Sequence, residues 1–398
     1  MQTKEALVFG AGNIGRGFLG DLLHQSGYHT TFVDVDKNKI ELINQQKEYP
    51  LVVVSSASKL ERMVNNVVAV SFADTDKVTA AVVGADVILT AVGKNALPYV
   101  AGALSKGLVE RVRQRPQDEL HSIVIACENV QDNSAYLKKM VESLLPAEYL
   151  SLLTEQISFP NCVVDRIVPN AALSDNPLLV TVEEYFQFVV DDTSLRSAFP
   201  EIKGIALSSD LPAIVEQKLF TPNMAHAIAA YYGYLKGCTY IHEAIADQNI
   251  VALVRGAAAE VALMLVERHP SITSDQQAAY AEKIIKRFEN PYLSDEVVRV
   301  AREPKRKLTA TDRLIRPAEL VFQQGRIPAY IATGVAAALH YNYQNDAQAL
   351  ELVGLIREQG VERVLEEVSG LSKGNPLSSL VKADYLFKAI WDTTYLPE

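Results

Sequence analysis

The sequence predicts an α/β protein in which a doubly wound parallel sheet domain precedes a mostly α-helical C-terminal domain. Short apolar runs alternate with helical patterns from the N-terminus to about residue 150. A glycine-rich segment, GAGNIGRGF, follows the first of these runs, and the spacing of apolar residues beyond Pro200 is helical. A chain of 398 residues has room for two domains. We place them at residues 1–200 and 201–398.

The elements of the first domain follow from the apolar spacing. Residues 6–10 (ALVFG) are wholly apolar, which is typical of a strand buried on both faces of a sheet. A glycine turn and a helix follow, and Gly27 stands where helices commonly end. Further strands are expected at 30–36, near the end of 78–93, and at 121–129. This alternation predicts a Rossmann-type parallel sheet with helices on both faces.

The pattern changes after about residue 155. As far as about 190, short β-rich runs are interrupted by Pro, Asn and Asp, and we expect extra strands that complete the first domain. The most apolar helical segment, at 250–270, carries Arg255 and Glu260. We therefore expect a buried core helix there and no membrane span.

Composition narrows the function classes. The net charge of −10 argues against nucleic acid or an anionic membrane as the main partner. Three cysteines, Cys127, Cys162 and Cys238, form no C-x-x-C pair, which favours a reducing compartment without disulfides or structural zinc. The N-terminal apolar run is short and leads directly into the glycines, unlike a signal peptide. We expect a cytoplasmic protein with a small-molecule partner and no metal.

The glycines predict a dinucleotide site. Gly10, Gly12 and Gly15 occupy the G-x-G-x-x-G positions between a strand and a helix. The first makes a tight turn, the second lets the main chain approach a pyrophosphate, and the third allows close packing. Asp34 ends the second strand, where a carboxylate meets the ribose hydroxyls and repels a 2′-phosphate. The cofactor is therefore predicted to be NAD rather than NADP, with Asp36 as the reserve candidate.

Two further segments belong to the predicted cofactor site. The TAVG turn at 90–93 ends another strand at the same edge, where it either passes under the nicotinamide or serves as an ordinary turn. Arg16 either contacts the pyrophosphate or faces solvent. The expected cofactor contacts are Phe9, Gly10, Ala11, Gly12, Asn13, Ile14, Gly15, Arg16, Asp34, Ala91, Val92 and Gly93.

A second group of polar residues suits chemistry between an alcohol and a ketone. KLFTPNMAH, at 218–226, contains Lys218, Asn223 and His226, with Thr221 and Pro222 placed as a helix N-cap and first helical residue. Oxidation of an alcohol needs a base for the hydroxyl proton and a donor for the carbonyl oxygen. Burial can bring a lysine pKa toward neutrality, so Lys218 can act as base without a metal. A surface lysine and a core histidine are the alternative.

Several stretches together resemble one family, the polyol-specific long-chain dehydrogenases. They are GAGNIGRGF, TAVG, IACEN, VDRIVP, KLFTPNMAH and RFENPYLSDEVVRVAREPKRKL, in this order over nearly the whole chain. The resemblance implies zinc-independent, NAD-linked interconversion of mannitol 1-phosphate and fructose 6-phosphate. It also implies that Lys218 is the base, that Asn129 and Asn223 stabilise the oxyanion, and that His226 orients the substrate.

The resemblance adds two weaker assignments. Asp165, in VDRIVP, falls near the substrate in relatives, and a structural role is an equal alternative. Glu216 lies two residues before Lys218 and is a candidate for tuning it. The resemblance favours a monomer and leaves an oligomer open.

A basic segment is the candidate phosphate site. Residues 299–316 hold seven Lys or Arg against two acids. Such a cluster is either a solvated surface or a pocket for a dianionic phosphate. We assign Arg306 and Lys307 to the phosphate, with Arg287 as a further candidate.

Two rival functions stay open. A hexuronate reductase of the same family, acting on tagaturonate or fructuronate, would direct the basic cluster at a carboxylate. A non-catalytic NAD-binding sensor would leave Lys218, Asn223 and His226 idle.

Overall fold

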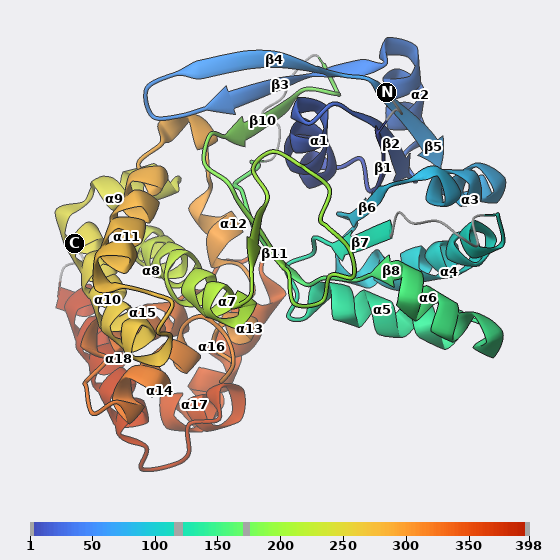
Figure 1. Ribbon diagram of the computed structural model, residues 1–398. Coiled ribbons are helices and arrows are strands. Elements are labelled where there is room, and N and C mark those ends of the chain that lie inside the picture. The colour runs from blue at the N-terminus through green and yellow to red at the C-terminus, as the bar shows by residue number, and fades with distance from the viewer. Residues whose placement is uncertain (1–3, 115–121, 170–175, 395–398) are drawn as a thin grey trace. The chain divides into compact units, whose positions relative to one another are not determined.

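The computed structural model describes residues 4–114, 122–169 and 176–394 (Figure 1). The chain forms two compact units, Met1–Leu211 and Pro212–Glu398. The sequence-based boundary at residue 200 lies inside the first of them, ahead of its last strand.

The first unit contains a six-stranded sheet in which every neighbouring pair is parallel. Its order is β5 (Val67–Ser71), β2 (Tyr28–Asp34), β1 (Lys4–Phe9), β6 (Val87–Thr90), β7 (Ser122–Ala126) and β8 (Ile157–Ser158). The chain runs outward in one direction from β1 to β5 and in the other from β6 to β8. The order therefore reverses between β1 and β6, and ligands of such sheets bind beyond the carboxyl ends of the strands at this point.

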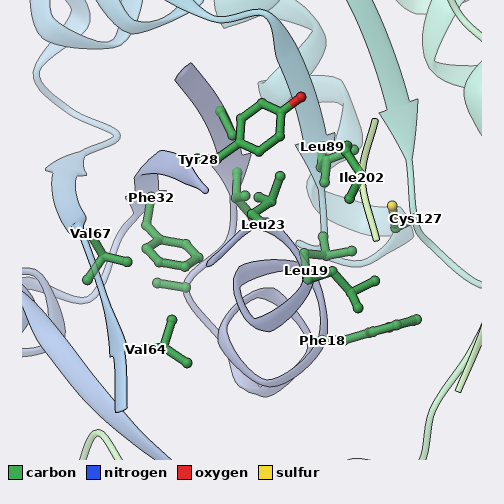
Figure 2. Close-up of a cluster of buried hydrophobic side chains, with 14 of the residues drawn as sticks. Phe18, Leu19, Leu23, Tyr28, Phe32, Val64, Val67, Leu89, Cys127 and Ile202 are labelled. Atoms are coloured by element: carbon green, nitrogen blue, oxygen red, sulfur yellow. The ribbon is translucent and has the colours of Figure 1, made fainter. Parts of the chain in front are cut away.

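The apolar side chains of strand β1 are buried on both faces of the sheet. Ala6 and Val8 belong to one buried cluster, while Leu7 and Phe9 belong to another. On the first face the π-helical turn η1 and helix α1 contribute Phe18, Leu19 and Leu23, which Figure 2 shows among the strand side chains. Helices α3, α4 and α5 cover the second face. The predicted Rossmann-type fold and the two-sided burial of this strand are confirmed.

The helices of the first unit alternate with these strands. They are η1 (Gly15–Gly20), α1 (Asp21–Gln25), α2 (Lys37–Gln46), α3 (Thr75–Gly84), η2 (Lys94–Ala96), α4 (Leu97–Gln114), α5 (Asn133–Leu144), η3 (Ala147–Tyr149) and α6 (Leu150–Gln156). Gly27, just past α1, has φ +78°, as expected for a residue that ends a helix.

Two smaller sheets complete the unit. One joins β10 (Val180–Glu183), β3 (Glu48–Val54) and β4 (Lys59–Asn65), and the other joins β12 (Ala206–Ser208), β11 (Gln187–Asp191) and β9 (Cys162–Asp165). The extra strands expected between 155 and 190 are therefore present, although only β8 extends the main sheet. The β3–β4 hairpin was not predicted from the sequence, and no strand was expected beyond residue 200, where β12 lies.

The second unit is helical in its described part, as predicted (Figure 1). Its elements are α7 (Leu211–Phe220), α8 (Pro222–Leu235), α9 (Ile241–Ala246), α10 (Gln248–Arg268), α11 (Ser274–Phe288), η4 (Pro291–Leu293), α12 (Val297–Ala301), α13 (Pro304–Lys307), α14 (Ile315–Gln323), α15 (Ala329–Leu339), α16 (Ala347–Gln359), α17 (Val361–Ser369) and α18 (Pro376–Thr394). Helix α8 packs against α9, α10, α12 and α15.

Helix α10 is the most apolar of these elements. By length and composition it is the one helix among the described residues that is able to cross a membrane. It packs against α8, α11 and α15, and Val254, Val261 and Leu265 on it are fully covered. These contacts agree with the core helix expected from the sequence.

Candidate active site

The glycine turn after β1 has the geometry that the motif predicts. Gly10 has φ +99°, and a Cβ atom on it would lie 2.5 Å from the carbonyl oxygen of Ala91. A Cβ on Gly15 would overlap the carbonyl oxygen of Gly10. A Cβ on Gly12, in contrast, would meet no atom within 4 Å. The first and third glycines are therefore needed by the fold itself, whereas the space beside Gly12 fits a pyrophosphate.

This contrast gives a prediction with two variants. Gly10→Ala is expected to lower the free energy of unfolding by about 2 kcal/mol, because it places a side chain in a strained conformation against a carbonyl. Gly12→Ala is expected to leave that free energy within about 0.5 kcal/mol but to weaken NADH binding at least tenfold. Urea unfolding and a fluorescence titration with NADH measure the two quantities. Unimpaired NADH binding by Gly12→Ala would contradict a pyrophosphate beside this residue.

A cavity of about 500 Å³ opens at the switch point between β1 and β6. Predicted cofactor residues that line it are Phe9, Gly10, Gly12, Asp34, Ala91 and Val92. The other predicted residues, Ala11, Asn13, Ile14, Gly15, Arg16 and Gly93, are not part of this lining.

The cavity also has apolar walls that the sequence analysis missed. Val35 and Tyr99 are 79% and 70% exposed, although both are large and apolar, and Phe72 lines the cavity beside them. Val35 directly follows β2 and Phe72 directly follows β5. The strand predicted at 30–36 included Val35, and no strand was predicted before Phe72, so neither position stood out in the sequence. These side chains suit a flat aromatic ring such as adenine.

Asp34 has the contacts expected of a ribose-binding carboxylate. Its Oδ2 accepts the N–H of Ala11 at 2.7 Å, and its Oδ1 accepts the N–H groups of Val35 and Asp36 at 2.8 and 2.9 Å. A carboxylate has about four acceptor positions, so one is left on Oδ2, which lies 3.9 Å from the ammonium of Lys39. Asp34 also lines the cavity. The carboxylate is held in one orientation before any ligand binds.

The reserve candidate, Asp36, has another role. Strand β2 ends at Asp34, two residues earlier than predicted, and Asp36 is the N-cap of α2. Its side chain accepts the N–H of Lys39 at 3.1 Å, and this hydrogen bond lowers the pKa of Asp36. Asp36 does not line the cavity, so the structure gives no support to it as the ribose ligand.

Arg16 is placed differently from either alternative drawn from the sequence. It is only 3% exposed, so the solvent-facing alternative is wrong. Its Nε donates to the carbonyl of Ala11 at 2.8 Å, and its guanidinium also donates to the carbonyl of Leu178. Arg16 therefore links the glycine turn to Leu178, close to β10. Because its guanidinium donates to these two carbonyl groups, the geometry does not favour a phosphate contact.

The edge formed by β6 and β7 carries the predicted oxyanion residue. Asn129 is exposed and follows β7 by three residues. Glu128, which the sequence analysis did not single out, is 5% exposed and accepts hydrogen bonds from Thr90 and Val92. Its place in IACEN, between a buried strand and the asparagine, was the available signal. Asp165 is half-buried at the end of β9 in the same unit.

In the second unit, KLFTPNMAH spans the junction of α7 and α8. Lys218 lies in the last turn of α7, and Asn223 and His226 lie at the start of α8. All three are half-buried. Thr221 is the N-cap residue and Pro222 the first helical residue, as predicted, but the Thr221 hydroxyl accepts from Gln277 at 2.8 Å instead of capping the helix. The short connection brings the ends of the two helices together.

His226 has a carboxylate partner that the sequence analysis missed. Its Nε2 lies 2.9 Å from Oδ2 of the buried Asp295, and its ring stacks on Phe288 at 4.5 Å. The Nε2–Oδ2 contact has hydrogen-bond length but not hydrogen-bond angles, so we treat it as electrostatic. Burial lowers the pKa of His226, and Asp295 offsets only part of that effect. His226 is therefore a neutral ring at pH 7, suited to orienting a hydroxyl group.

Two arginines, Arg287 and Arg299, act on His226 or on its neighbour Asp295. Arg299 donates to Asp295 at 2.8 Å, and Arg287, which is 9% exposed, also lowers the pKa of His226. Burial alone would raise the pKa of Asp295, but His226 and Arg299 hold it below its ordinary value. Asp295 is therefore an anion paired with Arg299. Among the predicted substrate residues, Arg287 is the one whose charge acts on His226.

Glu216 does not have the role that the sequence suggested. Its carboxylate makes two hydrogen bonds to Arg268, at 2.7 and 3.1 Å, and a third contact to His269 at 2.6 Å. These partners occupy both oxygens. The proposal that Glu216 tunes Lys218 therefore has no support in the contacts of this side chain.

The basic cluster is largely neutralised by acids. Arg306 pairs with Glu303 at 2.8 Å and with Asp312 at 3.2 Å, so its charge is already compensated. Lys307 is 3% exposed and donates to the carbonyl of Arg302. Burial, followed by repulsion from Arg313 and Arg306, lowers the pKa of Lys307 to about 7. Lys307 is the member of the cluster that would gain most from an added anion.

Within the described ranges, no group of three or more His, Cys, Asp or Glu side chains is arranged to hold a metal ion.

Two family models match the chain. The model of the mannitol dehydrogenase Rossmann domain matches residues 4–204, and that of the mannitol dehydrogenase C-terminal domain matches residues 210–390. A mannitol-1-phosphate 5-dehydrogenase of Caldanaerobacter subterraneus subsp. tengcongensis is 39% identical over 382 residues. The match covers 96% of this chain and 97% of that protein.

Solved structures share the fold at low sequence identity. A D-sorbitol dehydrogenase in substrate-free form has a TM-score of 0.83 and 18% identity, covering 98% of this chain and 94% of that one. Pseudomonas fluorescens mannitol 2-dehydrogenase, in a ternary complex with NAD and D-mannitol, has a TM-score of 0.76 and 18% identity. It covers 100% of this chain and 95% of that one. These structures show the fold, and the two family models together with the relative at 39% identity confirm the resemblance inferred from the motifs.

Proposed function

Because the chain belongs to the mannitol dehydrogenase family, we propose that it is an NAD-dependent dehydrogenase that interconverts mannitol 1-phosphate and fructose 6-phosphate. The identity of 39% with a mannitol-1-phosphate 5-dehydrogenase over almost the full length of both proteins is the observation that carries the substrate assignment. The open space at Gly12 and the anchored Asp34 carboxylate support the dinucleotide. Carbon 5 of the polyol becomes carbon 2 of the ketose.

The first unit contributes the binding groups. NADH, when bound, supplies the hydride for reduction of the ketose carbonyl. The Asp34 carboxylate holds the adenosine ribose and repels a 2′-phosphate, while the apolar walls at Val35 and Tyr99 cover the adenine ring. Asn129, at the carboxyl edge of the sheet, donates a hydrogen bond to the substrate oxygen as it gains negative charge.

The second unit contributes the proton chemistry. Lys218 donates a proton to the oxygen during reduction and accepts the hydroxyl proton during oxidation. Asn223, in the first turn of α8, donates a hydrogen bond to the substrate oxygen. Neutral His226, beside Asp295, orients a neighbouring hydroxyl. These roles need no metal ion.

The phosphate group distinguishes this substrate from the alternatives. We assign it to Lys307 and Arg287, which are buried cations, and we give Arg306 a smaller part because its charge is neutralised by Glu303 and Asp312. A charge-assisted contact to a dianion is stronger than one to a neutral hydroxyl. Asp165 remains a proposed substrate neighbour. We propose a monomer in the cytoplasm, and the three free cysteines fit that reducing compartment.

A substrate and cofactor panel tests the proposed function. Purified protein is assayed by the loss of NADH absorbance with fructose 6-phosphate, tagaturonate and fructuronate, and then with NADPH in place of NADH. We expect kcat/KM to be at least 100-fold higher with fructose 6-phosphate than with either hexuronate, and at least tenfold higher with NADH than with NADPH. A preference for a hexuronate would favour the reductase, and inactivity on every pair would favour the sensor.

A further inference from the structure

A buried carboxylate joins two segments at the carboxyl edge of the main sheet. Glu128 follows β7 and is 5% exposed. The hydroxyl of Thr90, the last residue of β6, donates to its Oε2 at 2.6 Å. The main-chain N–H of Val92 donates to its Oε1 at 3.0 Å. Both oxygens of one side chain are therefore committed to the 90–93 turn of the neighbouring strand.

The main chain of Glu128 is anchored as well. The amide of Asn133, which is 3% exposed, donates to the Glu128 carbonyl at 3.3 Å and to the Cys162 carbonyl at 2.9 Å. The Val130 N–H also donates to the Glu128 carbonyl, at 2.8 Å. Because both its main chain and its side chain are fixed, Glu128 transmits the position of the 127–130 segment to the turn after β6.

The turn held in this way belongs to the cofactor cavity. Ala91 and Val92 line it, and the Ala91 N–H donates to the carbonyl of Phe9 at 2.8 Å. A Cβ on Gly10 would lie 3.2 Å from the Val92 side chain, so the turn packs directly against the glycine turn. Along the chain, Glu128 is followed directly by Asn129, the proposed oxyanion donor. One carboxylate thus stands between a cofactor-contacting turn and a substrate-contacting residue.

We propose that Glu128 is a positioning residue that couples the 90–93 turn to Asn129, so that the cofactor site is ordered before the cofactor binds. This proposal rests on the proposed function and adds a residue that touches neither substrate nor cofactor. Without the carboxylate, the Thr90 hydroxyl and the Val92 N–H lose their acceptor in a covered site, which is costly. In part of the molecules the turn then occupies other conformations. The affinity for NADH falls in proportion to the fraction that keeps the conformation able to bind it.

Two substitutions of Glu128 separate positioning from charge. In Glu128→Gln, the amide oxygen accepts from Val92 while the NH₂ group donates to the Thr90 hydroxyl, so both contacts survive without the charge. In Glu128→Ala, both are lost. Asp86→Ala is the matched control, because the Asp86 carboxylate accepts the main-chain N–H of Glu5 at 2.8 Å at the opposite, amino-terminal edge of the same sheet. It removes a comparable contact away from the cavity.

The first measurement is the dissociation constant of NADH, obtained without sugar from the fluorescence of the bound nucleotide. We expect Glu128→Ala to raise it at least about tenfold, while Glu128→Gln and Asp86→Ala stay within about threefold of the unaltered protein. The second measurement is kcat with saturating NADH and fructose 6-phosphate. We expect it to fall at least fivefold for Glu128→Ala alone, because the side-chain link between the 90–93 turn and the segment that carries Asn129 is lost.

Three results would overturn the proposal. They are tight NADH binding and full kcat in Glu128→Ala, an equal loss of binding in Asp86→Ala, or a Glu128→Gln variant as defective as Glu128→Ala. The first would leave Glu128 without a role in binding or turnover, the second would make the loss a general effect on the sheet, and the third would make the charge itself the requirement. NADH binding is measured without sugar, so inactivity on fructose 6-phosphate would contradict the proposed function and leave this test intact.

Discussion

Lys218→Ala is expected to lower kcat by about 10²–10⁴-fold while leaving the dissociation constant of NADH within about twofold. The reason is that Lys218, in the last turn of α7, supplies the proton that reduction of a ketose requires. Stopped-flow turnover with fructose 6-phosphate and NADH measures kcat, and nucleotide fluorescence measures binding. The NADH cavity is formed by residues of the first unit, which Lys218 does not belong to.

Lys218→Arg decides whether proton transfer or positive charge is required. Arginine keeps the charge, but its pKa lies too far above neutrality for it to exchange a proton near pH 7. We expect it to be nearly as inactive as Lys218→Ala. The control is Lys236→Ala, which removes a surface lysine paired with Asp247 and should retain full kcat. A Lys218→Arg variant with more than a tenth of the original kcat would show that the lysine acts only through its charge.

Lys307→Met is expected to raise KM for fructose 6-phosphate at least tenfold and to leave turnover of unphosphorylated fructose unchanged. The methionine keeps the buried aliphatic volume of Lys307 and removes its charge. The physical reason is that a phosphate dianion stabilises the ammonium form of a lysine that burial and two arginines otherwise disfavour. Steady-state kinetics with both ketoses measure the effect.

The pH dependence of KM for fructose 6-phosphate also tests the role of Lys307. The pKa of Lys307 in the folded protein is about 7, below its ordinary value of 10.5, so the free protein loses this charge above about pH 7. KM for fructose 6-phosphate should therefore rise between pH 7 and 9, and the rise should be absent in Lys307→Met and with fructose. Stability has the matching sign: burying the charged lysine is unfavourable below pH 7, so Lys307→Met should not unfold more easily at pH 6. An unchanged KM and pH profile would remove Lys307 from the phosphate site.

The sequence predicted those parts of the fold that a local pattern determines. Residues of β1 are apolar on both faces because helices cover both sides of the sheet, and this gave the strand and the fold class together. The β3–β4 hairpin was missed because β3 pairs with β10, more than a hundred residues later in the chain, as well as with β4. Strand β2 was placed too long because Asp36, which continued the alternating pattern, caps the next helix instead.

The candidate site was predictable in its residue types but not in its pairings. The motifs gave Lys218, Asn223 and His226, because their spacing follows from one helix junction. Asp295 was not predicted as the neighbour of His226, since 69 residues separate them along the chain and only packing brings them together. The same holds for Arg16, for which the motif left a pyrophosphate contact or a place in solvent, but which folding buries against the carbonyl of Leu178.

The fate of the hydride tests the proposed reaction most directly. Fructose 6-phosphate is reduced with NADH that carries deuterium at the transferred position of C4, and the polyol phosphate is examined by NMR and mass spectrometry. We predict mannitol 1-phosphate with one deuterium at carbon 5, which Lys218→Ala forms at least about 100-fold more slowly than the unaltered protein. A product with no deuterium, or one with deuterium at another carbon, would contradict it.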